Sequence, residues 1–142
     1  MNEKCRNLPY LVLMQTSKAV QERIRLEMGV NHLSMTEFSV LEVLYHIGKQ
    51  TIHQIGNSIL ISSGSMTYVI DKLEKRNLLH RSACSDDRRV IYVTLTDEGK
   101  VLMEKIMPKH HELVDDMLGS LNDEEAMTLV ELLKKVEKRL KS

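Results

Sequence analysis

Hydrophobic residues recur every three or four positions along most of the chain, which is the spacing of one face of an α-helix. The segments with this spacing are 8–28, 34–48, 51–58 and 62–76, followed by two longer ones that begin at Thr96 and Asn122. Ser34 and Thr51 each stand three residues before a Glu or Gln, which is the arrangement of a capping box at a helix start. Pro108 falls inside the segment that begins at Thr96, so we expect that helix to bend or split there.

Between residues 79 and 95 the pattern changes to the alternation typical of strands. Segments 79–83 and 89–95 are predicted to pair as a hairpin around a polar loop at 84–88. Two short helices joined by a tight turn and followed by such a hairpin make a winged helix-turn-helix. The predicted fold class is therefore mainly α with a small β wing. The predicted boundaries are 1–33 for an N-terminal dimerisation helix, 34–97 for a winged helix-turn-helix DNA-binding domain and 98–142 for C-terminal dimerisation helices.

The composition fits one globular domain and excludes several classes of protein. The 142 residues carry 20 basic and 20 acidic side chains, so the formal net charge is zero. This balance disfavours a strongly basic, non-specific binder of nucleic acid. No apolar run is long enough for a membrane span or a secretory signal, so the chain is predicted to be cytoplasmic, with no membrane partner. Its two cysteines are too few for a disulfide framework.

The second helix of a helix-turn-helix enters the major groove of DNA, and in this chain its outer face is rich in hydroxyl groups. Such groups can donate to phosphates or to base edges, and a glycine lets the backbone approach closely. The candidate DNA-binding residues of this region are Ser62, Ser63, Gly64, Ser65, Thr67, Tyr68 and Lys72. An ordinary solvated helix face has a similar composition, so the helix alone does not establish DNA binding.

The loop of the predicted hairpin adds Asp87, Arg88 and Arg89 to the candidate DNA-binding residues. An arginine at the tip of a wing can enter a narrow minor groove, where the potential is most negative. Asp87 is expected to hold one arginine in place by a charge-assisted hydrogen bond. Between Ile61 and Lys100 there are seven basic and six acidic residues. A positive surface must therefore come from their arrangement in space.

Three stretches together resemble the MarR family of bacterial transcription regulators: VIDKLEKRNLLHR at 69–81, DRR at 87–89 and LTDEG at 95–99. The family pattern is Leu-Glu-x-x-Gly-Leu-Val-x-Arg, then a wing with Asp-Arg-Arg, then Leu-Thr-x-x-Gly. Asn77 stands where the family usually has glycine, and asparagine also tolerates a left-handed backbone. The resemblance extends over nearly the whole chain, including both flanking helical parts.

The resemblance implies a homodimer whose two winged domains bind double-stranded DNA at a pseudo-palindromic operator. It places Ser63, Gly64, Ser65, Thr67 and Tyr68 at the major groove, and Arg89, steadied by Asp87, in the minor groove. Apolar stripes on the last two predicted helices independently favour a partner chain, because one subunit offers little core to bury them. The stripes are Val101, Leu102, Ile106, Leu113, Met117 and Leu118, and then Ala126, Leu129, Val130, Leu133, Val136 and Leu140.

Sensing of small molecules is another property that the resemblance implies, in a pocket between the dimer helices and the DNA-binding lobe. Residues 37–46 and 61–69 resemble the branch of the family that responds to quinones and related phenolic electrophiles. A small aromatic or quinone effector is therefore a predicted partner. The candidate pocket residues are Tyr10, Met14, Met28, Met35, Phe38 and Tyr45. Methionine adapts to varied apolar ligands, but the same residues would also serve as ordinary core.

Cys5 and Cys84 are candidates for redox sensing. Two basic neighbours of Cys5 would favour its thiolate, and Cys84 begins the loop of the wing, where we expect it to be exposed. In one branch of the family a cysteine near the start of the first helix senses peroxides. Alignment at Ser34 places that position at Tyr10 and not at Cys5. Thiol sensing and two incidental thiols are both compatible with the sequence.

No catalytic, cofactor-binding or metal-binding motif accompanies these features. The six histidines form no ligand set, because most are scattered and the adjacent His110 and His111 point about 100° apart on a helix. The sequence therefore predicts a non-enzymatic, sequence-specific DNA-binding regulator without cofactor or metal: a repressor released by a phenolic or quinone-type ligand or electrophile. Two alternatives stay open: an oxidant-sensing repressor acting through Cys5 or Cys84, and a protein-interaction module of the same fold that does not bind DNA.

Overall fold

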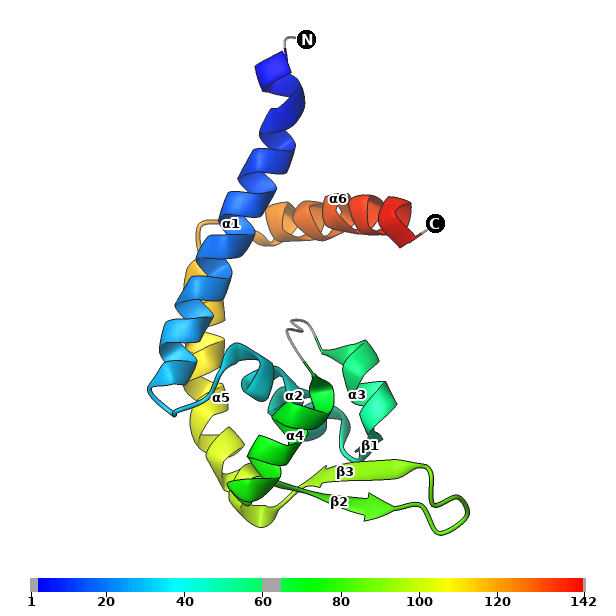
Figure 1. The fold of residues 1–142 in the computed structure, drawn as a ribbon. Coiled ribbons are helices and arrows are strands. Elements are labelled where there is room, and N and C mark those ends of the chain that lie inside the picture. The colour runs from blue at the N-terminus through cyan, green and yellow to red at the C-terminus, as the bar shows by residue number, and fades with distance from the viewer. Residues whose placement is uncertain (1–2, 60–64, 142) are drawn as a thin grey trace. The chain divides into compact units, whose positions relative to one another are not determined.

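The structure, a computed structural model, describes residues 3–59 and 65–141, with side chains from residue 7 onward. Its elements are α1 (Glu3–Gly29), α2 (Met35–Ile47), β1 (Gln50–Thr51), α3 (Ile52–Ser58), α4 (Met66–Lys75), β2 (Leu79–Ala83), β3 (Ile91–Leu95), α5 (Asp97–Met117) and α6 (Asp123–Lys141) (Figure 1). This order confirms a mainly helical chain with a small antiparallel sheet. None of the described helices combines the length and apolar character that a bilayer crossing requires.

The starts of α2 and α3 follow from local capping, as predicted. Ser34 accepts a hydrogen bond from the backbone N–H of Glu37 at 3.1 Å, and the Glu37 carboxylate accepts one from the backbone N–H of Ser34 at 2.9 Å. Thr51 and Gln54 make the same reciprocal pair. α1, in contrast, begins at Glu3, earlier than the predicted start at residue 8. That prediction took the first apolar residue as the start, whereas a helix also continues through polar residues.

Residues 1–106 form one compact unit with its own core. The buried apolar side chains of this unit are Met28, Leu33, Phe38, Val40, Leu41, Leu44, Ile55, Val69, Ile70, Leu73, Leu78, Leu79, Val93, Leu95, Met103 and Ile106. Three of them, Val69, Ile70 and Leu73, form the inner face of α4. Burial of these three side chains turns the opposite face of α4, with Thr67 and Tyr68, toward solvent.

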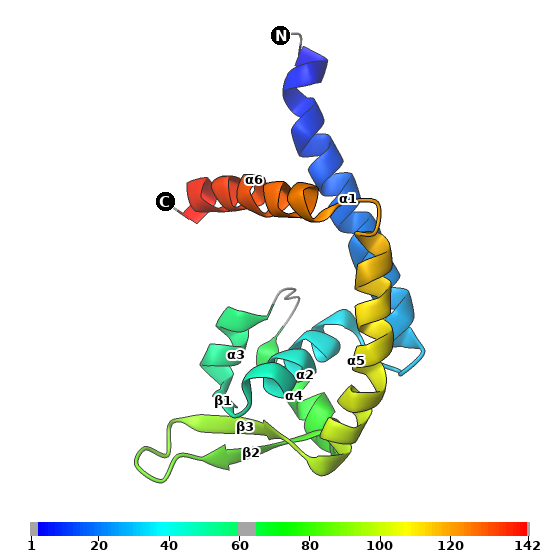
Figure 2. The ribbon, with the colours of Figure 1, turned by 180° about the vertical axis from the view of Figure 1, so that it is seen from behind.

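The sheet has three antiparallel strands in the order β1-β3-β2, one strand more than predicted. β1 pairs Gln50 with Val93, and β2 pairs Leu79 with Leu95 at the other edge of β3. β1 has only two residues, too few for any alternation to show in the sequence. β3 begins at Ile91 and not at residue 89, because the two residues before it belong to the loop of the hairpin. β2 contacts α4 and β3 contacts α2, and the loop that joins the two strands extends beyond the helices (Figure 2).

The connections around β2 depend on two special backbone positions. Asn77, between α4 and β2, has φ of 59°, which confirms that it adopts the left-handed conformation of the glycine it replaces. Gly99, in the first turn of α5, lies so close to the backbone of Leu78 that a Cβ there would collide with the Leu78 carbonyl oxygen. Thr96 begins α5 as predicted, since its hydroxyl accepts from the Gly99 N–H at 3.0 Å.

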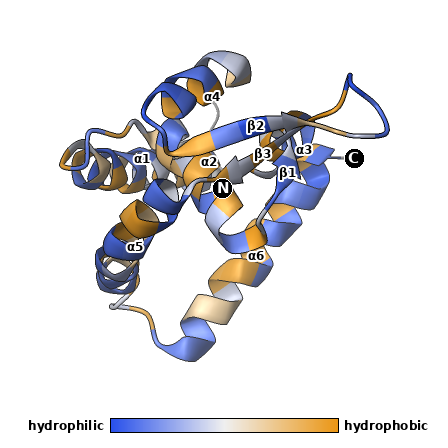
Figure 3. Ribbon diagram, turned by 90° about the horizontal axis from the view of Figure 1, so that it is seen from below, coloured by the Kyte–Doolittle hydropathy of each residue, from blue (hydrophilic) through white to orange (hydrophobic). Residues whose placement is uncertain are grey.

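Residues 107–142 form the second compact unit. α5 runs through Pro108 without interruption, so of the two predicted outcomes, a bend or a split, the split is wrong. The boundary between the two units falls beside Pro108. No described residue of α6 is buried. Apolar residues recur along α6 and stay exposed (Figure 3). They are Met127, Leu129, Val130, Leu132, Leu133, Val136 and Leu140.

Candidate nucleic-acid interface

The outer face of α4 gathers the predicted DNA-binding residues that the structure describes. Ser65, Thr67, Tyr68 and Lys72 are all exposed. The Lys72 ammonium lies 5.5 Å from the centre of the Tyr68 ring, within cation–π range. The face therefore offers hydroxyl donors and one positive charge from a helix whose other side is anchored in the core. The remaining predicted residues of this region, Ser62, Ser63 and Gly64, lie outside the described residues.

The tip of the β2–β3 hairpin holds an arginine in a defined position. The backbone N–H and Nε of Arg89 donate to Oδ1 of Asp87 at 3.0 and 3.1 Å, and Nη2 donates to Oδ2 at 3.2 Å. These bonds confirm the predicted contact of Asp87 with one arginine, and they hold the pKa of the Asp87 carboxyl below its ordinary value. The Arg89 side chain nevertheless remains 90% exposed. Its charge is thus oriented and still accessible, and the neighbouring Arg88 is exposed as well.

A second arginine, which the sequence analysis did not single out, ties the wing to α4. Nη2 of Arg81 on β2 lies 2.8 Å from carboxylate oxygens of both Asp71 and Glu74 on α4. The backbone N–H of Arg81 also donates to Glu74 at 3.1 Å. We call this set, Asp71, Glu74 and Arg81, the wing brace. It joins the two elements that would contact DNA and restricts their relative movement.

The wing brace predicts a pH-dependent contribution to stability. Hydrogen bonds from Arg81 lower the pKa of Glu74, so the contribution is present above the ordinary pKa of a glutamate and is lost as the pH falls through the lowered value. Glu74→Gln should therefore lower the midpoint of urea unfolding at pH 6, and the difference from wild type should disappear toward pH 3. Glu104→Gln, a change on the exposed face of α5, serves as the control. An equal difference at both pH values would contradict this role of Glu74.

Lys49 is a further cation beside the wing. Its ammonium lies 4.4 Å from the centre of the Tyr92 ring on β3. The sequence analysis missed Lys49 because only the pairing of β1 with β3 brings the segment after α2 next to the wing. Lys49 is thus a third exposed or ring-stacked cation near the candidate interface, with Lys72 on α4 and Arg89 on the hairpin.

The predicted effector-pocket residues occupy different environments. Met28 and Phe38 are buried in the core, whereas Tyr10 and Met14 are 63% and 53% exposed. Met35 is half-buried, and Tyr45 is exposed and makes an edge contact with the ring of His46. A pocket lined by these six residues therefore stays a prediction.

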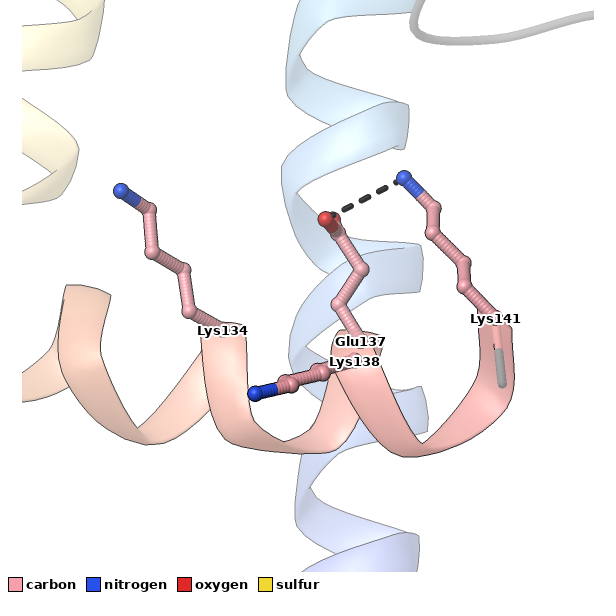
Figure 4. Close-up of a pocket in the computed structure, with 4 residues that line it drawn as sticks. All are labelled: Lys134, Glu137, Lys138 and Lys141. Atoms are coloured by element: carbon pink, nitrogen blue, oxygen red, sulfur yellow. Dashed lines mark hydrogen bonds and ion pairs between the residues drawn. The ribbon is translucent and has the colours of Figure 1, made fainter.

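The structure does describe a hollow of about 490 Å³ on α6 (Figure 4). It is lined by Lys134, Glu137, Lys138 and Lys141, and Lys141 pairs with Glu137 at 3.2 Å. Effector pockets for aromatic molecules are mostly apolar and enclosed. The charged lining of this hollow does not match the effector pocket that the sequence predicts.

Cys84 is half-buried at the start of the hairpin loop, which is less exposed than predicted. Its backbone N–H donates to the Val90 carbonyl at 2.9 Å and closes the loop. Hydrogen bonds from the backbone N–H groups of Asp86 and Asp87 to the sulfur lower the pKa of the thiol. These contacts favour the thiolate, which is the reactive form. The side chain of Cys5 lies outside the described side chains.

The described residues contain no cluster of three or more His, Cys, Asp or Glu side chains that could hold a metal ion. His110 is buried in the helix α5, while His111, next to it, is exposed. This difference agrees with the expectation that the two adjacent rings point in different directions.

Solved structures of known regulators share this fold. BpsR of Bordetella bronchiseptica, whose structure concerns regulation of DNA binding by 6-hydroxynicotinic acid, is 26% identical, with a TM-score of 0.80 over 92% of this chain and 98% of that one. NadR in complex with 4-hydroxyphenylacetate is 25% identical, with a TM-score of 0.74 and coverage of 89% of both chains.

Sequence comparison leads to the same group. The MarR family model matches residues 33–91, which include α2, α4 and most of the wing. The HTH-type transcriptional regulator MhqR of Bacillus subtilis (strain 168) is 41% identical over 136 residues, 96% of this chain and 93% of that protein. MhqR, which this chain matches over nearly its whole length, is a transcriptional regulator. The chain belongs to the MarR family and is a DNA-binding transcriptional regulator with a winged helix-turn-helix.

Proposed function

We propose that the chain is a homodimeric repressor that binds a pseudo-palindromic operator and is released by a small phenolic or quinone-type effector. The observation that carries the proposal is the Asp87–Arg89 pair at the tip of the projecting hairpin, because it orients an exposed cation for a minor groove. The exposed face of α4 supplies donors for the adjacent major groove. Residues 34–97 would then bind DNA in the cytoplasm.

Dimerisation through residues 1–33 and 98–142 is supported by apolar surface that one chain leaves uncovered. Leu8, Tyr10 and Met14 on α1 are each more than half exposed, and α6 has no buried residue. A surface of this kind on a soluble regulator is typical of an interface. A two-fold dimer would place two α4 helices on successive major grooves, about 34 Å apart.

An aromatic effector is supported by two relatives of the same fold. The BpsR structure concerns regulation by 6-hydroxynicotinic acid, and the NadR structure is a complex with 4-hydroxyphenylacetate; both molecules are hydroxylated aromatic acids. Such a molecule would release DNA if it bound more tightly to a dimer whose α4 spacing no longer matches the operator.

Selection of genomic fragments by the purified protein tests the proposal. We expect enrichment of one pseudo-palindrome at moderate salt, and a stepwise loss of its affinity as catechol or benzoquinone is added. An enriched operator with no response to either compound would remove the effector part of the proposal. No enrichment, with the dimer intact by light scattering, would instead favour a protein-interaction module.

Sensing through Cys84 is a second candidate, favoured by the hydrogen bonds that lower the pKa of its thiol. The thiolate would add to a ring carbon of a quinone, forming a C–S bond, while an electron pair moves to one quinone oxygen, which takes a proton from water. The attacked carbon then loses its hydrogen as a proton to water, and the second quinone oxygen takes a proton, which gives a hydroquinone adduct. An adduct in the wing would stand beside Asp87 and Arg89 and obstruct the minor groove.

In the Cys5→Ser variant, we expect Cys84 to react with iodoacetamide with a pH midpoint below that of free cysteine measured alongside, because the thiolate is stabilised in the folded loop. The Cys84→Ser variant should keep its DNA affinity after treatment with benzoquinone, whereas wild type should lose it. If Cys84→Ser still releases DNA on treatment, the response is reversible binding or resides at Cys5. Urea-unfolded protein, in which the loop contacts are absent, provides the control for the pH midpoint.

A further inference from the structure

Arg76 connects α4 to the turn between α1 and α2. It stands directly after α4, and its guanidinium extends across to residues more than forty positions earlier in the chain. Nη1 donates to the backbone carbonyl of His32 at 2.7 Å, and Nη2 to that of Asn31 at 3.4 Å. We infer that Arg76 is a positioning residue that sets the orientation of α4 relative to α1 and thereby determines how well α4 fits its operator.

The turn is a suitable anchor for such a contact. The last turn of α1 contains no basic residue that could complement the negative end of the helix dipole, and the two carbonyl groups that Arg76 contacts lie just beyond this turn. Arg76 supplies a positive charge there from another element. Met28 and Leu33, on either side of the turn, are buried, and His32 takes φ of 58°, which fixes the direction of the chain between them.

Arg76 and the wing brace hold α4 from two directions. The buried face of α4 permits small rotations and tilts, because apolar packing has no preferred direction. The bonds of Arg81 tie the C-terminal half of α4, through Asp71 and Glu74, to β2, and those of Arg76 tie the end of α4 to the turn after α1. A displacement of α1 would therefore move the carbonyl groups to which Arg76 is bonded, and α4 with them.

This inference rests on the proposed DNA-binding function and extends it. In the proposed dimer α1 belongs to the dimerisation arm, so Arg76 would transmit changes in the arm to α4. The guanidinium is already engaged with backbone carbonyl groups, so its role differs from that of a phosphate contact, which lends affinity to any DNA sequence.

The test compares Arg76→Gln with Lys75→Gln. Lys75 is the exposed neighbour of Arg76, and its replacement by glutamine also removes one positive charge. Affinities are measured for the selected operator and for an unrelated duplex of equal length, each at several salt concentrations. We expect Arg76→Gln to weaken operator binding about tenfold more than Lys75→Gln does. Affinity for the unrelated duplex and the salt dependence should be the same for both variants. Arg76→Lys, which keeps one donor, should recover part of the loss.

Equal effects of the two variants on both duplexes would overturn the inference. So would a slope of log affinity against log salt concentration that is shallower by about 1.8 for Arg76→Gln alone, because this change marks the loss of one phosphate contact from each subunit of the dimer. Thermal melting of each variant separates a folding defect from misplacement of α4. If Arg76→Gln proves unfolded, the same affinities are compared for Arg76→Lys and Lys75→Gln. If wild type itself does not distinguish the operator from the unrelated duplex, the proposed function fails, and the inference fails with it.

Discussion

Replacing Arg89 with alanine is expected to lower the affinity for the operator about 100-fold, because each dimer loses two arginine contacts worth about 1–3 kcal/mol apiece. Arg89 is exposed and is held by two side-chain hydrogen bonds to Asp87, so its removal takes away an oriented charge without disturbing the core. Fluorescence anisotropy with labelled operator at fixed salt measures the change. Thr67→Ala should weaken binding from the major-groove side through loss of a hydroxyl donor.

Lys105→Ala is the matched control for Arg89→Ala. Lys105 is exposed on α5, so this variant loses the same charge away from α4 and the hairpin. Its affinity should stay within about twofold of wild type, because only long-range electrostatics change. Light scattering should show the same oligomer for all variants. If Arg89→Ala binds the operator as wild type does, the minor-groove assignment of the wing is wrong.

Replacing Gly99 with alanine is expected to destabilise the fold by about 3 kcal/mol, at the upper end of the range for overpacking. The added Cβ would overlap the carbonyl oxygen of Leu78, and backbone cannot move aside as a flexible side chain can. The same carbonyl accepts the N–H of Thr96 at 3.1 Å, so any shift also weakens the start of α5. Thermal melting should show a decrease in Tm of about 10 °C.

Gly56→Ala is the control for Gly99→Ala. Apart from its own helix, no described residue brings an atom within 4 Å of a Cβ placed at Gly56, which is part of α3. Alanine favours a helix by about 1 kcal/mol over glycine, so this variant should be as stable as wild type or more so. A Gly99→Ala protein as stable as the Gly56→Ala protein would show that the contact with Leu78 relaxes without cost.

Local signals were sufficient to predict much of the fold. The capping boxes at Ser34 and Thr51 are determined by residues only three positions apart, and both are present as expected. β2 has its predicted limits, and Asn77 takes the left-handed conformation that the glycine of the family pattern implies. The bidentate contact of Asp87 with Arg89 could also be predicted, because the two residues are close in the chain.

Contacts between distant segments could not be predicted in the same way. Arg81 meets Asp71 and Glu74 only because β2 folds back along α4, and Arg76 meets His32 across forty-four positions of sequence. β1 is a strand only because it pairs with β3, and its two residues show no hydrophobic alternation in the sequence. The region proposed to contact DNA could therefore be predicted from the sequence, whereas the side chains that hold α4 and the hairpin in register could not.

In the proposed dimer, the exposed apolar face of α6 would make the structure of this helix depend on the amount of protein in the cell. A helix of 19 residues with no buried side chain is only marginally stable in water. In the proposed dimer the partner would supply the missing contacts, so dilution would unfold α6 as well as separate the subunits. A cell with few copies would then hold unfolded arms that proteases can cleave. Repression would then begin only above a threshold concentration of the protein, set by the affinity of the two subunits for each other.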